Sequence, residues 1–202
     1  MFKEELNKQN AILILAGRLG SVSCFNSYEY FLNIGNSLAI DKILNSIEIT
    51  NKFKSYIAVS KIDEKFAAFK PFKNIELINV GLTCGVIETI RKSLSFISEE
   101  NIFIIPITTI PDQKKMIKNV CYFSDLSLPK ENWSAIQIGK NNDYKYFFKH
   151  DESSFAKESF PFTGRISARR DHLIKAIENF PNNKTDDMLY LVQKLIEDFK
   201  YK

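Results

Sequence analysis

The chain has 202 residues, of which 45% are hydrophobic and 26% are charged, and its formal net charge is +4. This composition is that of an ordinary globular protein, and the length suits a single domain over residues 1–202 with a sizeable core. The small positive charge suits an anionic ligand but does not require nucleic acid, so we expect no nucleic-acid partner.

The cysteines exclude two further classes. Cys24, Cys84 and Cys121 are odd in number, far apart and without a CxxC pair, which argues against a disulfide framework and a zinc site. Residues 1–10 are polar and do not form a signal peptide, and no apolar stretch approaches the roughly 20 residues of a membrane helix. We therefore expect a cytoplasmic protein with no membrane partner.

Strand and helix patterns alternate in the first half of the chain. Apolar runs, typical of strands buried on both faces, occur at 11–16, 55–59 and 102–107, and 75–80 is a further predicted strand. Apolar residues at helical spacing predict helices over 37–47, 62–69 and 86–97. This alternation favours an α/β fold with a parallel sheet and right-handed crossovers.

The second half has a different pattern. Short aromatic-rich runs predict further strands, some of them antiparallel, at 120–123, 133–138, 144–148 and 160–167. Two helices close the chain, the first with Leu173, Ile177 and Phe180 on one face. Thr185 is the expected N-cap of the second, whose apolar stripe runs over 188–199. The sheet is therefore expected to be mixed.

A glycine-containing turn follows the first predicted strand. Gly17 and Gly20 let the backbone come close to a bound group, and open α/β sheets bind ligands at the carboxyl ends of their strands. We predict a phosphate or nucleotide here; the alternative is a tight turn without a ligand. The Arg18 guanidinium either grips a phosphate, is solvated, or fills the site.

Further along, three places are candidates for ligand contacts. Thr83, Cys84 and Gly85 stand at a helix start, where N–H groups either bind a polar ligand or serve ordinary capping. Lys149 is a candidate phosphate ligand; His150 is either catalytic or a surface residue, and His172 is expected at the surface. A basic cluster of Arg165, Arg169 and Arg170 around Gly164 either binds an acceptor phosphate or is a solvated helix start.

With these positions in place, the chain resembles the nucleotidyltransferase family that makes nucleoside-diphosphate sugars and related activated compounds. Leu15-Ala16-Gly17-Arg18-Leu19-Gly20-Ser21 is similar to the family's L-A-G-G-x-G-[ST]-R, and residues 31–41 are similar to its I-G-G-K-P-L-I-D segment. Residues 81–85 lie where the family has a turn that contacts the base. Phe147-Phe148-Lys149 is similar to its E-K-P segment, and residues 162–166 to its G-I-Y strand.

The resemblance implies a Rossmann-like fold of the GT-A type, with a mixed, mainly parallel sheet and helices on both faces. It implies transfer of a nucleotidyl group from a nucleoside triphosphate to a small phosphorylated acceptor, with release of pyrophosphate, in sugar or surface-polysaccharide metabolism. The implied nucleotide-binding residues are Leu15, Ala16, Gly17, Gly20, Ser21, Thr83, Cys84 and Gly85. Gly164 and Arg165 are the implied acceptor contacts, and Arg18 and Lys149 the implied catalytic cations.

The departures from the family pattern concern the chemistry. Arg18 replaces a glycine, Val22 stands at or near the signature arginine, and Glu29-Tyr30 replaces Pro-Lys. Thr108-Thr109 replaces the Gly-Asp after the fourth strand, and threonine is a poor Mg²⁺ ligand. The family implies Mg²⁺, for which Asp112 and Asp187 are candidates; Asp187 is also explained by helix capping together with Asp186.

Two other functions stay open from the sequence. One is a catalytically degenerate nucleotide-binding or scaffold homologue that pairs with an active enzyme. The other is a glycosyltransferase of related fold, although the sequence lacks the Asp-x-Asp motif that such enzymes usually need. A homodimer and a pairing with another enzyme are equally open.

Overall fold

The computed structural model describes residues 9–16, 33–34, 36–46, 53–60, 75–107, 109, 118–123, 134–140, 143–148, 159–178, 180 and 188–202. The elements follow in the order β1 Asn10–Leu15, β2 Asn33–Ile34, β3 Ser37–Leu38, α2 Ala39–Ser46, β4 Lys54–Val59, β5 Ile75–Asn79, α4 Val86–Ser93, β6 Asn101–Pro106, β7 Val120–Phe123, β8 Ala135–Ile138, β9 Tyr144–Phe147, β10 Phe160–Arg169, α5 Arg170–Glu178 and α6 Leu189–Phe199.

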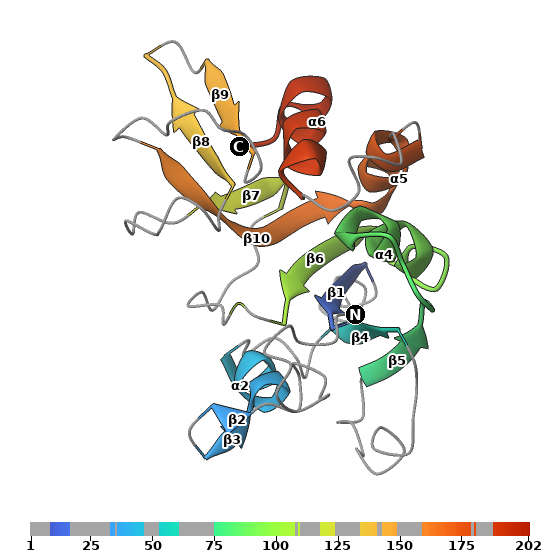
Figure 1. Cartoon of the computed structure of the whole chain (residues 1–202). Helices are drawn as coiled ribbons and strands as arrows, with labels where there is room; N and C mark the ends of the chain where they lie inside the picture. Colours follow the sequence, from blue (N-terminus) through green and yellow to red (C-terminus); the bar gives the residue numbers. More distant parts are fainter. Residues whose placement is uncertain are drawn as a thin grey trace, which may run out of the picture.

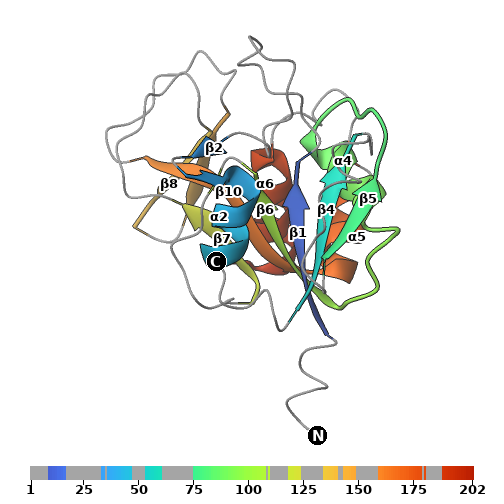
Figure 2. The same cartoon turned by 90° about the horizontal axis from the view of Figure 1, so that it is seen from below.

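Four parallel strands form one half of the main sheet, in the order β5-β4-β1-β6 (Figures 1 and 2). Ile14 of β1 is in register with Ile57 of β4 on one side and with Ile105 of β6 on the other. All six residues of β1 are buried, which explains the continuous apolar run in the sequence, because a strand covered on both faces needs no polar side.

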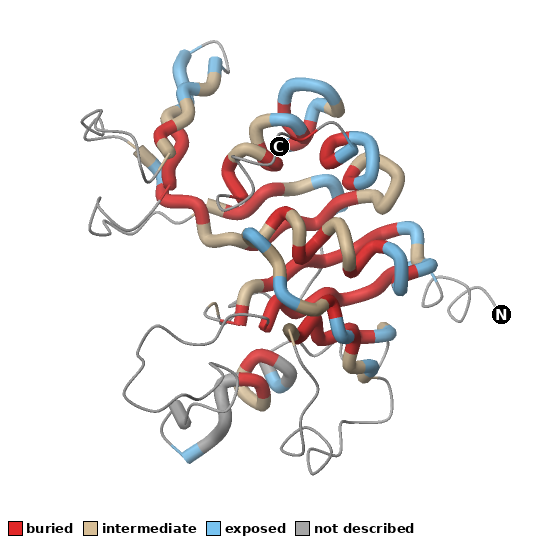
Figure 3. The backbone as a smooth tube through the Cα atoms, turned by 45° about the vertical axis from the view of Figure 1, so that its right-hand side comes forward, coloured by how far each residue is buried: buried red, intermediate tan, exposed pale blue. Residues whose placement is uncertain are grey.

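Helices cover both faces of this parallel core. Alternate side chains of β1 point to opposite faces. Leu13 packs in one apolar cluster with residues of α4, α5 and α6, whereas Ile14 packs in a second cluster with Ile40 and Ile43 of α2. Figure 3 shows the buried strands as a continuous red centre, with exposed segments around it. The predicted α/β class, with helices on both faces, is confirmed.

The other half of the sheet is antiparallel and is organised by β10, the long orange strand of Figure 1. The second half of β10 pairs with β6, with Ile166 opposite Ile104, and β10 also pairs with β7 and, at its start, with β8. The hairpin of β8 and β9 extends the sheet further. The register between β10 and β7 shifts between Phe162 and Ile166, and this irregularity contains Gly164.

Gly164 is required where it stands. Its φ of +79° lies in the left-handed region that side chains rarely adopt, and a Cβ built on it would lie 2.5 Å from Cγ of Pro106, the last residue of β6. The absence of a side chain therefore lets β10 pack directly against the end of β6.

Most predicted elements are present, with shifted ends. The helix expected over 86–97 ends at Ser93. Leu94 and Ile97 beyond it are still buried, so the apolar pattern continues past the end of the helix. β10 continues to Arg169, and α5 follows it directly. The helix predicted over 62–69 and the N-cap predicted at Thr185 lie outside the described residues. Among the described helices, none is both long and apolar enough to cross a bilayer.

Candidate nucleotide site

The carboxyl ends of the four parallel strands meet at one edge of the sheet, which we call the carboxyl edge. It consists of the last residues of the strands and those that follow: Leu15–Ala16 of β1, Val59–Ser60 of β4, 80–85 after β5, and Pro106, Ile107 and Thr109 of β6. Backbone hydrogen bonds hold these ends together. The Ala16 N–H donates to the Ala58 carbonyl (2.9 Å), and the Ile107 N–H donates to the Leu15 carbonyl (3.1 Å). The Val80 N–H donates to the Val59 carbonyl (2.9 Å). The strand ends are therefore fixed relative to one another.

At this edge the structure places part of the predicted nucleotide site. Leu15 and Ala16 are buried, so their side chains belong to the core, and what they fix is the start of the turn that follows. That turn lies outside the described residues, and with it the predicted contacts Gly17, Arg18, Gly20 and Ser21. The replaced signature positions Val22 and Tyr30 lie outside as well, as does Lys149. Their predicted roles stay predictions.

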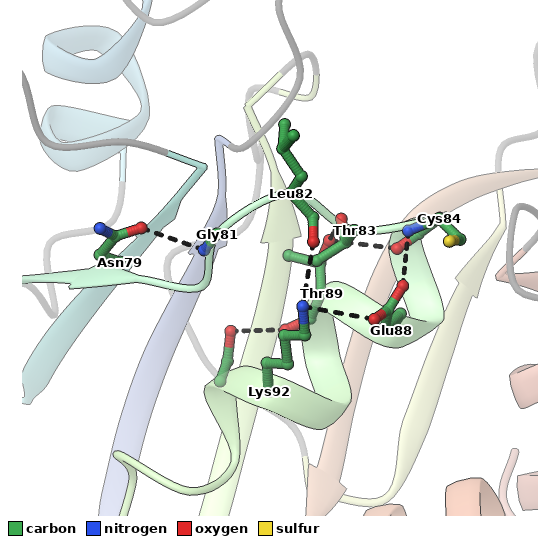
Figure 4. Close-up of polar contacts among 10 residues, drawn as sticks. Asn79, Gly81, Leu82, Thr83, Cys84, Glu88, Thr89 and Lys92 are labelled. Atoms are coloured by element: carbon green, nitrogen blue, oxygen red, sulfur yellow. Dashed lines mark hydrogen bonds and ion pairs between the residues drawn. The ribbon is translucent and has the colours of Figure 1, made fainter.

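The loop between β5 and α4 is the best-defined part of the edge (Figure 4). The Gly81 N–H, at a φ of +66°, donates to Oδ1 of Asn79 at 3.0 Å. The Thr89 hydroxyl donates to the Gly85 carbonyl (3.1 Å), so the Thr83 hydroxyl is the donor in its 2.8 Å contact with Oγ1 of Thr89. Side chains of β5 and α4 thus hold the loop from both sides.

Glu88, in the first turn of α4, completes this loop. Its carboxylate accepts a hydrogen bond from the Cys84 N–H and lies 3.3 Å from Nζ of Lys92, which itself donates to the Leu82 carbonyl at 3.0 Å (Figure 4). The hydrogen bond from the Cys84 N–H lowers the pKa of Glu88 below its ordinary value. Desolvation acts in the opposite direction, and the nearby Lys92 lowers the pKa as well. Glu88 was not among the sequence candidates, although a glutamate three residues after a helix cap is a known capping signal.

The loop geometry bears on the predicted base contacts. Thr83, Cys84 and Gly85 do lie at the start of α4 and at the carboxyl edge, as predicted. However, the Cys84 N–H is already bonded to Glu88, so a ligand that uses this donor must displace the Glu88 carboxylate. The Leu82 side chain points away from the core and is 88% exposed.

The predicted acceptor residues lie on β10, beside the end of β6. The Thr109 hydroxyl donates to the Thr163 carbonyl (3.0 Å), and the Thr163 hydroxyl donates to the Tyr122 carbonyl (2.7 Å). The Arg165 Nε donates to the Thr163 hydroxyl oxygen at 3.3 Å, and the guanidinium carbon lies 4.9 Å from the ring centroid of Tyr122. Arg165 is only 7% exposed. Gly164 and Arg165 are therefore fixed next to the carboxyl edge.

The structure does not bring the three arginines together around Gly164, whereas Arg169 and Arg170 do lie where α5 begins, which agrees with the alternative of a helix start. Arg169 pairs in register with Asn101, the first residue of β6, so it lies at the opposite edge of the sheet from the site. There it forms a bidentate pair with Asp171 at 3.0 and 3.1 Å. Arg170 donates to the Leu94 carbonyl (3.0 Å) and so joins α5 to the end of α4. Four residues of extended strand separate Arg165 from Arg169 by about 13 Å, which is why sequence neighbours do not form one site.

His172 lies in the first turn of α5, as expected, and is partly exposed, but its side chain also makes packing contacts. Its ring stacks on Phe199 with centroids 4.3 Å apart, and its Nδ1 lies 3.1 Å from the Tyr201 hydroxyl. The side chain is 20% exposed. His172 therefore packs α5 against the end of α6, away from the carboxyl edge. His150 lies outside the described residues.

A cleft of about 450 Å³ lies between α4 and α5, lined in part by Arg91, Arg170 and Ile177. Arg91 donates to the Ile177 carbonyl (3.0 Å), just as Arg170 donates to that of Leu94. Each guanidinium thus satisfies a carbonyl at the end of the other helix, where cations are favoured by the helix dipole. These contacts explain the two arginines as links between helices, at the end of α4 remote from the site.

The described residues do not fit the Mg²⁺ site that the family resemblance implies. Thr109, at the position of the expected metal-binding carboxylate, uses its hydroxyl to hold Thr163. Within the described residues, no group of three or more His, Cys, Asp or Glu side chains is placed to hold a metal ion. Asp112 and Asp187 lie outside those residues, so their predicted role as ligands stays a prediction.

The strand order and the mixed sheet define a class of fold. The chain has the Rossmann-like fold of solved nucleotidyltransferases, which confirms at the level of fold the resemblance noted in the sequence. No family model and no curated protein matches its sequence.

Three solved structures illustrate the likeness. One, from Bacillus anthracis and named as a glucose-1-phosphate thymidylyltransferase, is 12% identical, with a TM-score of 0.71 over 94% of this chain and 83% of the other. The inositol-1-phosphate CTP transferase of T. maritima is 17% identical (TM-score 0.67, 96% and 83% covered). A UDP-glucose pyrophosphorylase complexed with UDP-glucose is 9% identical (TM-score 0.68, 95% and 98% covered). These proteins are named for three different nucleotides.

Proposed function

We propose that the chain, as a single domain over residues 1–202, binds a nucleoside triphosphate at the carboxyl edge and transfers its nucleotidyl group to a small phosphorylated acceptor. The observation that supports this most is that the end of β1, with Ala16, and the loop before α4 lie at the same edge of a β5-β4-β1-β6 core. Solved neighbours with this fold are named as enzymes that act on nucleotides and sugar phosphates. Ligands of open α/β sheets bind at this edge.

The reaction is an in-line displacement at the α-phosphorus. An oxygen of the acceptor phosphate forms a bond to that phosphorus, the bond to the bridging oxygen breaks, and pyrophosphate leaves with the electron pair. Negative charge grows on the phosphate oxygens, so fixed cations are needed. We assign this role to Arg18 and Lys149, with the Gly17–Gly20 turn as the phosphate cradle and Ser21 beside it.

Gly164 and Arg165 are the proposed acceptor side of the site. Thr163 and the Tyr122 ring hold the Arg165 guanidinium next to the end of β6. Because Arg165 is almost fully buried, a phosphate that reaches it is withdrawn from water, where charge-assisted hydrogen bonds are stronger. This geometry supports a contact with an anionic acceptor. We further propose that the acceptor belongs to sugar or surface-polysaccharide metabolism and that the protein acts in the cytoplasm.

A second candidate keeps the nucleotide and loses the reaction. Thr109 holds Thr163 where the resemblance implies a metal carboxylate, and Glu88 occupies the Cys84 N–H in the loop. Both observations favour a nucleotide-binding or scaffold protein without turnover, and its pairing with an active enzyme or with a second copy of itself is part of this proposal. Both candidates predict nucleotide binding, but only the first predicts turnover.

Pyrophosphate release separates them. The full chain is mixed with each nucleoside triphosphate, Mg²⁺ and a panel of sugar and polyol phosphates, and pyrophosphate is measured. If the chain transfers a nucleotidyl group, pyrophosphate is released with at least one pair of nucleoside triphosphate and acceptor. The rate of release should fall tenfold or more in Lys149→Gln, because a cation beside the developing charge is removed. Lys140→Gln, which changes an exposed lysine on the β8–β9 turn, is the matched control and keeps the wild-type rate.

Two other outcomes are informative. Nucleotide binding in a thermal-shift assay without any pyrophosphate release establishes the second candidate, because a ligand that binds only the folded state raises its apparent stability. If no nucleoside triphosphate or nucleotide sugar shifts the unfolding temperature, both candidates are wrong.

A further inference from the structure

The cleft between α4 and α5 has a volume of about 450 Å³, a size that suits a small organic ligand. The two helices lie next to each other (Figure 1). Leu94, which lines the cleft, follows the end of α4, and Arg170 follows Arg169 at the edge of the sheet opposite the carboxyl edge. The cleft is therefore separate from the proposed nucleotide site.

Two guanidinium groups line this cleft, and both keep donors beyond those that link the helices. A guanidinium carries five N–H donors. One nitrogen of Arg91 donates to the Ile177 carbonyl, and one nitrogen of Arg170 donates to the Leu94 carbonyl. Within the described part of the chain, neither guanidinium forms an ion pair with a carboxylate. An anion in the cleft would therefore meet two positive charges that carbonyl groups alone do not neutralise.

One of the remaining donors is buried. Among the residues that the structure describes, Nε of Arg170 has no hydrogen-bond acceptor although it is inaccessible to solvent. A buried donor without an acceptor is costly, and a bound ion is one of the groups that account for such a donor. Because the positive charge is delocalised over the guanidinium, an anion on the outer nitrogens also stabilises this group. This observation, independent of the cavity, points to an anion beside Arg170.

The other lining residues define the class of anion. Glu178 lines the same cleft, so two guanidinium groups and one carboxylate leave a single net positive charge there. This charge matches a monoanion, and the Glu178 carboxylate repels a second negative charge. The walls are aliphatic: Leu94 and Ile177 are buried, whereas Ile174 is 37% exposed. An aliphatic chain that covered Ile174 would remove apolar surface from water.

We propose that this cleft binds an aliphatic carboxylate, whose charged group contacts Arg91 and Arg170 and whose chain lies against Ile174 and Ile177. The fork of a guanidinium matches the two oxygens of a carboxylate. A nucleoside triphosphate carries several negative charges and does not match the charge of this cleft. The proposal does not depend on the proposed function, because it concerns a second site made of other residues.

Calorimetry on the full chain at pH 7 tests the class of ligand, with hexanoate, acetate and hexyl phosphate as probes. We expect one equivalent of hexanoate to bind. Acetate should bind at least about tenfold more weakly, because each fully buried methylene contributes about fourfold. Hexyl phosphate carries up to two negative charges at this pH. It should bind about threefold more weakly than hexanoate because Glu178 repels the additional charge.

Two variants test whether hexanoate binds in the cleft. Arg91→Gln removes one guanidinium and should weaken binding at least about tenfold, while the Ile177 carbonyl keeps its hydrogen bond from the Phe180 N–H. Ile174→Glu adds a carboxylate to the cleft at an exposed position and should weaken binding to a similar extent. The matched control is Lys175→Gln, which makes the same change in net charge at the next, exposed residue of α5 and should leave the constant unchanged. Unfolding temperatures without ligand verify that all three variants are folded.

Glu178→Gln tests the charge of the cleft in the opposite direction, and it should tighten the binding of hexyl phosphate about threefold. Failure of the wild type to bind hexanoate, or unchanged hexanoate binding in either Arg91→Gln or Ile174→Glu, overturns the site. Binding of hexyl phosphate as tight as that of hexanoate overturns the assignment to a carboxylate. None of these results bears on a nucleotide at the carboxyl edge, so the proposed function is tested separately.

Discussion

Gly164→Ala is the substitution whose cost can be worked most directly from the structure. At a φ of +79°, alanine pays about 1–2 kcal/mol for the left-handed backbone. Its Cβ would also lie 2.5 Å from Cγ of Pro106, about 1 Å closer than an ordinary carbon contact. The proline ring has little freedom to move, so overpacking adds about 1–3 kcal/mol. The total loss of unfolding free energy is about 2–5 kcal/mol.

Gly81→Ala separates the two costs. Gly81 has a φ of +66°, but a Cβ there meets no atom within 4 Å, so only the backbone cost of about 1–2 kcal/mol applies. Urea unfolding of wild type and both variants measures the difference, provided that the m-value is unchanged. If Gly164→Ala loses no more stability than Gly81→Ala, β10 does not pack against the end of β6 as described, and the acceptor side of the site must be redrawn.

Three further predictions follow from described contacts. Thr163→Val removes the donor to the buried Tyr122 carbonyl and should lower the free energy of unfolding in urea by about 1–3 kcal/mol. Thr163→Ser retains the donor and should keep most of the wild-type stability, so equal losses in the two variants would contradict the hydrogen bond. Because the pKa of Glu88 is lowered, its ionised form stabilises the fold at pH values above the ordinary pKa of 4.5. The excess stability of the wild type over Glu88→Gln should therefore disappear as the pH falls through the lowered pKa, and a difference that persists at pH 2 would refute this cause. Burial raises the pKa of the Cys121 thiol to about 12, so peptide mapping after alkylation of the native protein at pH 8 should show modified Cys84 and unmodified Cys121, and rapid labelling of Cys121 would show that its burial is wrong.

The parallel half of the fold could be predicted from the sequence because its burial is local and complete. β1 is covered on both faces, so every residue of 11–15 is apolar, and the same holds for most of β6. The alternation with helices then leaves few topologies to consider. Strand ends were uncertain by one or two residues, because the polar residue Asn10 begins β1 and Asn101 begins β6 while both are still buried.

The antiparallel half and the acceptor side could not be predicted in the same way. β10 pairs with three different strands, and its irregularity at Gly164 depends on contact with Pro106, which is 58 positions earlier in the chain. The link from Thr109 to Thr163 depends on the same contact. By contrast, the capping role of Glu88 has a signal in the sequence, because a glutamate three residues after the helix cap Gly85 is typical of a helix start.

The central claim is that the carboxyl edge binds a nucleotide, and hydrogen exchange measures it most directly. Exchange of backbone amides is followed by mass spectrometry of the full chain with and without a saturating nucleoside triphosphate. We predict slower exchange in peptides that cover the turn after β1 and the β5–α4 loop, residues 16–21 and 80–85, because a bound nucleotide shields both. Protection confined to the cleft between α4 and α5, with unchanged exchange at the carboxyl edge, would contradict the claim.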